Sequence, residues 1–322
     1  MVAARHGWED EAVTAPALAT LANALTWTGQ FDLADPWLDR ARRATQADGE
    51  PGIRLLVCLT AAMLQAARGH GHGALEEFAA ARRMQALMVG EHGLTTRVNA
   101  WGIATQARLG MSERARLTLA ALDGRQAGTG EIRNAAAVIL LAEQYPAAAR
   151  RELRAVLDGD VPVLSHATRV EAHLLDAFAC RDLGDKPASQ LAAERALDLA
   201  EPDRLILPFA MTGAWQLLET VSPHGTSHAA LITDILDAVR VPGRGGLNQP
   251  AMMPGHELSR SELRVLRYLP TNLTRREIAG ELSVSLNTVD THIRRIYAKL
   301  GAADRTAAVE RGRELRLLSA GR

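Results

Sequence analysis

Few residues of this chain could do chemistry by their type and spacing, and each pattern is incomplete. Glycine and histidine alternate over 69–73, but no cysteine or further histidine follows at the spacing of a zinc site. The only lysines, Lys186 and Lys299, do not follow a glycine, which excludes the phosphate-binding loop of an ATPase. No motif of a serine hydrolase or a metalloprotease occurs either. The sequence therefore predicts no enzyme, no cofactor and no metal site.

A second group of polar residues, near the C-terminus, fits binding better than catalysis. Residues 257–322 hold 13 Arg and Lys against 8 Asp and Glu, a net charge of +5, although the whole chain has a formal net charge of zero. A basic segment attached to a mildly acidic body is what binding to phosphates at one end requires.

Capping motifs predict where the first two helices of this basic segment begin. Ser259 and Glu262 are three residues apart, as are Thr274 and Glu277, and each pair has the pattern of a capping box. The first box precedes apolar residues at helical spacing. The second opens a short helix that runs to Leu282.

A third and a fourth helix follow. Ser285 is the expected N-cap of a helix over about 286–300, and Asp304 is the expected N-cap of a helix through about Leu317. The third helix has an apolar stripe of Val289, Ile293, Ile296 and Leu300. Two short helices joined by a tight turn, the second of them basic, are typical of a helix-turn-helix that places its second helix in the major groove of DNA.

The opposite side of the third helix is polar and basic over its first two turns, the part that meets base edges in a major groove. The residues on this side are Asn287, Thr288, Asp290, Thr291, Arg294 and Arg295. Its N-terminus also directs free backbone N–H groups toward phosphate. The full set of predicted DNA-binding residues adds Thr274, Arg275, Ser285, His292 and Lys299.

These residues resemble the DNA-binding domain of the LuxR family over essentially all of 257–318. The resemblance is carried by Leu258-Ser-Arg-Ser-Glu262, Glu277-Ile-Ala279, Val284-Ser285, Asn287-Thr-Val289, His292 and Ile296-Tyr-Ala-Lys-Leu300. It implies that base edges are contacted by Asp290, Thr291 and Arg294. It also implies that Asn287, Thr288, His292 and Arg295 lie nearer the phosphates, and that the chain forms a homodimer through 305–317.

Asp290 departs from the resemblance, because the family usually has Lys or Arg at this position. A carboxylate there reduces the attraction to phosphate, although it could accept a hydrogen bond from a cytosine amino group. Two hypotheses follow. Either Asp290 contributes to sequence recognition, or the protein is an interaction scaffold whose DNA binding has weakened.

The preceding region contains an internal repeat. Turn residues Gly29, Gly69, Gly110, Gln144 and Gly184 recur at intervals of 40, 41, 34 and 40 residues, and small residues follow most of them at fixed spacing. The pattern predicts helical hairpins stacked into a solenoid. It resembles tetratricopeptide repeats, with longer gaps; a looser hairpin array or an ordinary helical bundle is the alternative.

The predicted organisation is all-α: a helical repeat region at 1–240, a linker at 241–256 rich in Pro and Gly, and the DNA-binding domain at 257–322. A repeat body ahead of a LuxR-type domain also resembles the large regulators related to the maltose activator. Those regulators carry an N-terminal ATPase that is missing here, so this chain would be a short member or a truncated one.

The sequence thus predicts a transcription regulator that binds double-stranded DNA, with a repeat region that senses a protein or small-molecule effector. Cys58 and Cys180 are far apart, which favours two buried thiols in a reducing compartment over a disulfide. No signal peptide and no apolar run of membrane-spanning length occurs, so a cytoplasmic protein without a membrane partner is expected.

Overall fold

Every regular element in the part of the chain that the structure describes is a helix, with no strand among them. The structure, a computed structural model, describes residues 12–45, 50–219, 227–239, 260–271, 273–282, 286–300, 302, 304–314 and 317. The predicted all-α fold is confirmed. None of the described helices combines the length and the apolar character that crossing a membrane requires.

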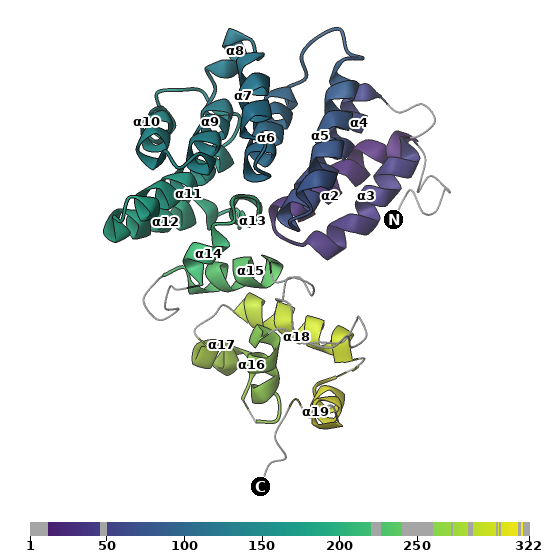
Figure 1. Ribbon diagram of the computed structural model, residues 1–322. Helices are drawn as coiled ribbons and strands as arrows, with labels where there is room; N and C mark the ends of the chain where they lie inside the picture. Colours follow the sequence, from purple (N-terminus) through teal and green to yellow (C-terminus); the bar gives the residue numbers. More distant parts are fainter. Residues whose placement is uncertain are drawn as a thin grey trace. The chain divides into compact units, whose positions relative to one another are not determined.

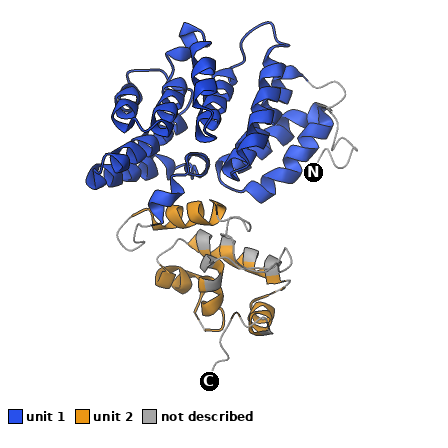
Figure 2. Ribbon diagram, in the orientation of Figure 1, with its two compact units in different colours: residues 1–220 blue, residues 221–322 orange. Residues whose placement is uncertain are grey.

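The chain forms two compact units, residues 1–220 and residues 221–322 (Figure 2). The helix α15 (Ala229–Val239) belongs to the second unit, whereas the predicted repeat region extended to residue 240. The predicted linker at 241–256 lies outside the described residues. The exact domain boundaries therefore stay a prediction.

The first unit is an array of helical hairpins (Figure 1). The paired helices are α2 (Ala15–Trp27) with α3 (Phe31–Ala44), α4 (Pro51–Ala67) with α5 (Gly71–Gln85), α6 (Thr95–Arg108) with α7 (Ser112–Ala120), α9 (Gly130–Ala142) with α10 (Pro146–Leu157), and α11 (Ala167–Asp182) with α12 (Lys186–Ala200). The shorter elements are η1 (Ala12–Thr14), α8 (Gly124–Ala127), α13 (Leu207–Thr212) and α14 (Trp215–Leu218).

Each hairpin turn contains one residue in the left-handed region of backbone conformation. The φ angles are 73° at Gly29, 81° at Gly69, 77° at Gly110, 65° at Gln144 and 81° at Gly184. Glycine adopts this conformation without the steric cost of a Cβ atom. These are the five positions on which the sequence repeat is aligned, so the predicted array of hairpins is confirmed; its membership of the tetratricopeptide family stays a prediction.

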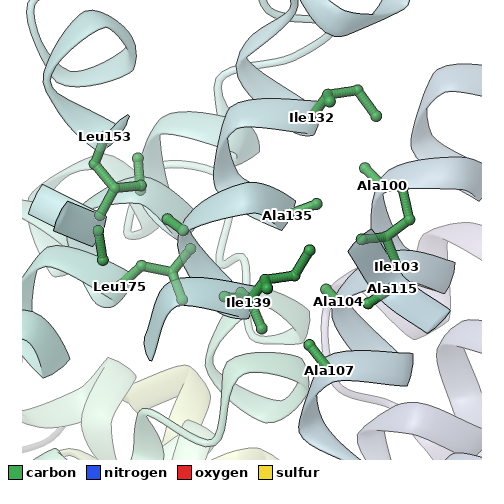
Figure 3. Packing of buried hydrophobic residues seen from close by; sticks show 14 of the residues in the cluster. Ala100, Ile103, Ala104, Ala107, Ala115, Ile132, Ala135, Ile139, Leu153 and Leu175 are labelled. Atoms are coloured by element: carbon green, nitrogen blue, oxygen red, sulfur yellow. The ribbon is translucent and has the colours of Figure 1, made fainter. Parts of the chain in front are cut away.

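The small residues of the repeat lie where the two helices of a hairpin meet. Ala34, Ala74, Ala115 and Ala149 are fully buried, and Ser189 is 8% exposed. A small side chain at these positions lets the backbones approach closely. Larger apolar side chains fill the space between neighbouring helices. Figure 3 shows one such cluster, in which α6, α7, α9, α10 and α11 contribute side chains.

The short helix α13 contacts both ends of the hairpin array, because it packs against α2 and α4 as well as against α11. The backbone N–H of Ile206, just before α13, donates to the carbonyl of Trp27 at 3.0 Å. A Cβ atom at Gly29 would lie 2.6 Å from the Ile206 side chain. Glycine at this turn therefore serves both the left-handed backbone and the close approach of α13.

The second unit contains five described helices. They are α15, α16 (Arg260–Tyr268), α17 (Arg275–Leu282), α18 (Leu286–Leu300) and α19 (Arg305–Glu314). The last four share a core in which the predicted stripe of α18 is buried: Val289, Ile293, Ile296 and Leu300 are each at most 5% exposed. The bounds of α18 match the predicted third helix, whereas α19 ends three residues before the predicted Leu317.

Candidate DNA-binding interface

The helix α17 begins with a reciprocal capping box. The backbone N–H of Thr274 donates to the Glu277 carboxylate at 2.7 Å, and the backbone N–H of Glu277 donates to the Thr274 hydroxyl at 3.3 Å. The hydrogen bond from the Thr274 backbone N–H first, and then one from the Thr274 hydroxyl to the same carboxylate at 2.7 Å, lower the pKa of Glu277. The predicted capping box is thus confirmed. It fixes the start of the helix that precedes α18, since it satisfies two N–H groups that a helix start leaves unpaired.

The helix α18 has one buried, apolar side and one polar side. Its apolar stripe packs into the core of the unit, and Arg294 on another face is exposed to solvent. Asp290 lies one turn before Arg294 and is partly exposed. A carboxylate and a guanidinium four residues apart on a helix lie on the same face. This face therefore presents both a hydrogen-bond acceptor, the Asp290 carboxylate, and several donors, the N–H groups of the Arg294 guanidinium.

Asp290 forms an ion pair with the first residue of α17. The Arg275 guanidinium donates to the Asp290 carboxylate at 3.0 Å, and the two side chains are 58% and 26% exposed. The pair joins the two helices of the predicted helix-turn-helix on their solvent side. The positive charge of Arg275 offsets the negative charge that Asp290 would otherwise direct at a phosphate. Both residues are predicted to bind DNA, but their pairing is not predicted, because nothing in their spacing shows how α17 and α18 cross.

His292, for which the family resemblance implies a position near the phosphates, is buried. Its side chain is 3% exposed, and its Nε2 atom is 3.9 Å from the Asp237 carboxylate of α15. With α15 in this position a phosphate does not reach the imidazole. The helix that covers it, α15, belongs to a segment that was assigned to the repeat region, and the role of His292 stays a prediction.

The remaining predicted contacts fall on residues whose side chains the structure does not describe. Asn287, Thr288, Thr291, Arg295 and Lys299 belong to α18 by their backbone, but their side chains lie outside the description. Ser285, the predicted N-cap of α18, lies wholly outside the described residues, as does Ser259 of the first capping box. Their roles stay predictions.

Arg305 holds the turn between α16 and α17, a role that the sequence analysis did not assign. Its guanidinium donates to the backbone carbonyls of Leu269, Tyr268, Thr271 and Leu273 at 2.8 to 3.3 Å. A cation at this place satisfies carbonyls that the end of α16 leaves unpaired. Asp304 just before it accepts from the backbone N–H of Ala307 at 2.9 Å, which confirms its predicted capping role.

The sequence model of a known family matches this part of the chain. Residues 256–311 match the family described as bacterial regulatory proteins, luxR family. The match covers α16, α17, α18 and most of α19. None of the solved structures compared with the chain matches it.

Proposed function

Because residues 256–311 place this chain among the LuxR-family transcription regulators, which bind DNA, we propose that α18 is its recognition helix and enters the major groove of double-stranded DNA. The observation that carries this proposal is the polar face of α18. There the exposed Arg294 lies one turn beyond the Asp290–Arg275 ion pair, while the opposite stripe is buried. An arginine on this face is suited to bidentate contact with guanine, and Asp290 is suited to accept from a cytosine amine.

The basic character of residues 257–322 supplies the second part of the proposal. Their net charge of +5 favours phosphate contacts that set the position of the domain on the duplex without reading sequence. Sequence preference then comes from the few side chains of α18 that reach base edges. This division predicts binding that weakens with salt on every sequence and that is strongest on one operator.

Selection of genomic fragments bound by the full-length chain tests the proposal. We expect a recurrent sequence that binds about a thousandfold or more tightly than a shuffled version at physiological salt. A selection that returns no common sequence, with equal affinity for shuffled DNA, would favour the alternative of an interaction scaffold with weakened DNA binding. The observation behind that alternative is the Asp290 carboxylate on the recognition helix, and its pairing with Arg275 weakens the case, since the pair has no net charge.

We further propose that the chain binds DNA as a homodimer through α19, as the family resemblance implies. The residues exposed on α19 are polar or charged, among them Glu310, Arg311 and Arg313. A dimer formed through this helix would rely on polar contacts and would weaken with salt. Sedimentation of the full chain at low and high salt, with and without the selected operator, measures this. A monomer that binds one half-site under all conditions refutes the dimer.

The repeat unit at 1–220 takes the role of effector sensor in this proposal. Stacked helical hairpins provide extended binding surfaces, and a regulator needs an input that is separate from its DNA contacts. Effector binding to the repeat unit would change the affinity of the second unit for the operator, and by linkage the operator would change the affinity for the effector equally.

A further inference from the structure

The repeat unit contains a pocket that is built by the first helices of three consecutive hairpins. On α6 the residues Arg97, Trp101 and Arg108 lie on one side, because they are four and then seven residues apart. Trp101 and Arg108 line the pocket together with Glu131 and Asn134 of α9 and Glu171 of α11. The pocket has about 300 Å³ of empty volume, counting the part open to solvent. Beside the side chains that line it, it has room for about one group of the size of a water molecule.

Two carboxylates line this pocket without a cation close to either of them. Glu131 is 3% exposed; its Oε1 atom accepts from the backbone N–H of Leu164 at 2.7 Å and from the Thr168 hydroxyl. Glu171 is 7% exposed and, among the described residues, accepts only from the indole N–H of Trp101, at 3.2 and 3.3 Å. Neither carboxylate has an arginine, lysine or histidine nitrogen within 4.0 Å among the described residues. Buried carboxylates ordinarily have such a partner, because desolvation of an unpaired charge is costly.

The nearby arginines are held away from these carboxylates. Arg97 lies over two neighbouring indole rings, 5.3 Å from the centre of Trp27 and 5.4 Å from that of Trp101, and it donates to the Ser165 hydroxyl at 2.8 Å. Arg108, at the other end of the same side of α6, is exposed to solvent and makes no hydrogen bond to any described residue. Arg108 is thus available to an anion at the pocket.

Two acceptor atoms in the pocket wall are buried without a hydrogen bond among the described residues. They are the Oε2 atom of Glu131 and the Oδ1 atom of Asn134. The Asn134 amide nitrogen donates to the Thr168 carbonyl at 2.8 Å, which fixes its oxygen as the remaining acceptor. A buried acceptor that lacks a donor destabilises the folded chain, so a ligand that supplies the donor recovers that free energy.

The pKa of Glu171 fits a carboxylate without an ion-pair partner. Desolvation raises the pKa of Glu171 to about 7, and the negative charge of Glu131 raises it as well. Arg97, the hydrogen bond from Trp101 and Arg108 lower this pKa, but by less than desolvation raises it. A positively charged donor close to Glu171 would restore its ionised form.

From these contacts we propose that the pocket binds a small zwitterion, whose ammonium group is received by Glu131, Asn134 and Glu171 and whose anionic group is bound by Arg108. An ammonium group has three donors and is nearly the size of a water molecule. Both properties match the room in the pocket and the acceptors around it. Free α-amino acids and the N-terminal residues of short peptides share this chemistry. The inference rests on the proposed effector role of the repeat unit, and it names the chemical class of the effector.

Titration of the full-length protein with individual L-amino acids, followed by calorimetry and by tryptophan fluorescence, tests the inference. Trp101 donates to Glu171, so its emission reports on the pocket directly. With ligands up to about 10 mM, where a millimolar Kd is visible, we expect at least one amino acid to bind. Its methyl ester, which lacks the carboxylate, and its N-acetyl derivative, which lacks the ammonium group, should each bind about tenfold or more weakly. A dipeptide with the same first residue distinguishes a free amino acid from a peptide N-terminus.

Matched variants assign the binding to this pocket. Glu131→Gln and Glu171→Gln remove one carboxylate each while keeping the side-chain shape. Each should weaken binding of the amino acid by about tenfold or more. Glu113→Gln, an exposed position on α7, is the control and should leave binding unchanged. Arg108→Gln alters a solvent-exposed side chain, so it keeps the test valid if a buried variant fails to fold. It should remove the preference for the amino acid over its methyl ester.

Several outcomes overturn the inference. These are no binding by any amino acid or dipeptide, equal binding of a simple alkylamine, unchanged binding to both Glu variants, or binding of a divalent cation in place of the amino acid. All of these measurements are made without DNA. A chain that binds amino acids but selects no DNA sequence refutes the proposed function and leaves this inference standing, whereas the reverse result refutes only the inference.

Discussion

Charged side chains that carry the proposals for the second unit lie at its surface, whereas those that carry the proposal for the first unit line a pocket in its interior. Arg275 and Asp290 are 58% and 26% exposed and pair with each other across two helices. Glu131 and Glu171 are 3% and 7% exposed, and each accepts only from neutral donors.

The difference has a physical consequence for what each unit can recognise. Exposed charges are screened by salt and act on an extended polyanion through their sum, so that no single contact dominates. Buried charges in a low-dielectric pocket act strongly on one small ion, because water does not compete for them. The surface of the second unit therefore suits DNA, and the pocket of the first unit suits a single small molecule.

The largest effect is expected when one unit alone is destabilised, which tests whether the two units are independent. Leu153 of α10 is fully buried, and Leu153→Ala should lower the free energy of unfolding of the repeat unit by about 2–5 kcal/mol. All five tryptophans lie within residues 1–220, so their fluorescence follows this unit. Leu191→Ala, at a 55% exposed position on α12, should change it by less than about 0.5 kcal/mol.

Ile296→Ala provides the matching change in the core of the second unit, where Ile296 is also fully buried. It should destabilise that unit by about 2–5 kcal/mol and weaken DNA binding, while the tryptophan transition stays where it is. If Leu153→Ala and Ile296→Ala shift the tryptophan transition equally, the two units do not unfold separately and the comparison fails.

The regular parts of both units could be predicted from the sequence, because local signals specify them. The left-handed turn residues gave the hairpins even where Gln144 replaces glycine, and the spacing of Thr274 and Glu277 gave the start of α17. The buried stripe of α18 followed from its 4-3-4 spacing. In each of these the partners are close in sequence, so that one backbone geometry fixes their positions.

Contacts between distant elements could not be predicted in this way. Glu131 and Glu171 lie in different hairpins, and nothing in the sequence predicts that they line one pocket. The burial of His292 depends on α15. The hydrogen bonds from Arg305 to the turn after α16 depend on how α19 crosses α16. Such contacts depend on the packing of whole helices, for which a single sequence gives no register.

The second prediction uses the pH dependence of stability to compare buried and exposed carboxylates. The pKa of Glu171 is raised to about 7 in the folded chain from an ordinary value of 4.5, so the folded state takes up a proton more readily than the unfolded state. Its contribution to stability is present below pH about 4.5 and is lost as pH rises through about 7, a change on the order of 3 kcal/mol.

The wild-type chain and Glu171→Gln should therefore differ in how the free energy of unfolding changes with pH. The variant should be the more stable of the two above pH 7, with the difference shrinking toward pH 5, as followed by tryptophan fluorescence in urea. Glu113→Gln, at an exposed site, should keep the wild-type profile. Parallel profiles for the wild type and Glu171→Gln would mean that Glu171 is not desolvated.

The third prediction concerns the exposed arginine of the recognition helix. Arg294→Ala should weaken binding to the selected operator by about 1–3 kcal/mol and relax the preference at one base pair, as loss of a base contact does. Arg264→Ala removes the same charge from an exposed position on α16 and is the matched control. It should affect operator and shuffled DNA alike. Equal losses on both sequences in Arg294→Ala would remove Arg294 from the proposed base contacts.

The smallest expected effect concerns the ion pair between Arg275 and Asp290. An exposed pair of this kind contributes about 0.2–1 kcal/mol to stability, which a double-mutant cycle of Arg275→Ala and Asp290→Ala measures. Its effect on DNA recognition is more informative than its effect on folding. In Asp290→Ala, Arg275 is released to contact any phosphate, so affinity for shuffled DNA should rise and its log–log salt dependence should steepen by about 0.9.

The double variant separates two roles of Asp290, contact with a base and restraint of Arg275. Without Arg275 the gain on shuffled DNA should disappear, while any contact of Asp290 with a cytosine amine remains lost. If Asp290 reads a base, the ratio of operator affinity to shuffled affinity falls in both Asp290→Ala and the double variant. If Asp290 only restrains Arg275, the ratio falls in the single variant and recovers in the double one. A ratio that rises in Asp290→Ala contradicts both and favours the scaffold alternative, because the carboxylate would then only repel the duplex from the helix meant to read it.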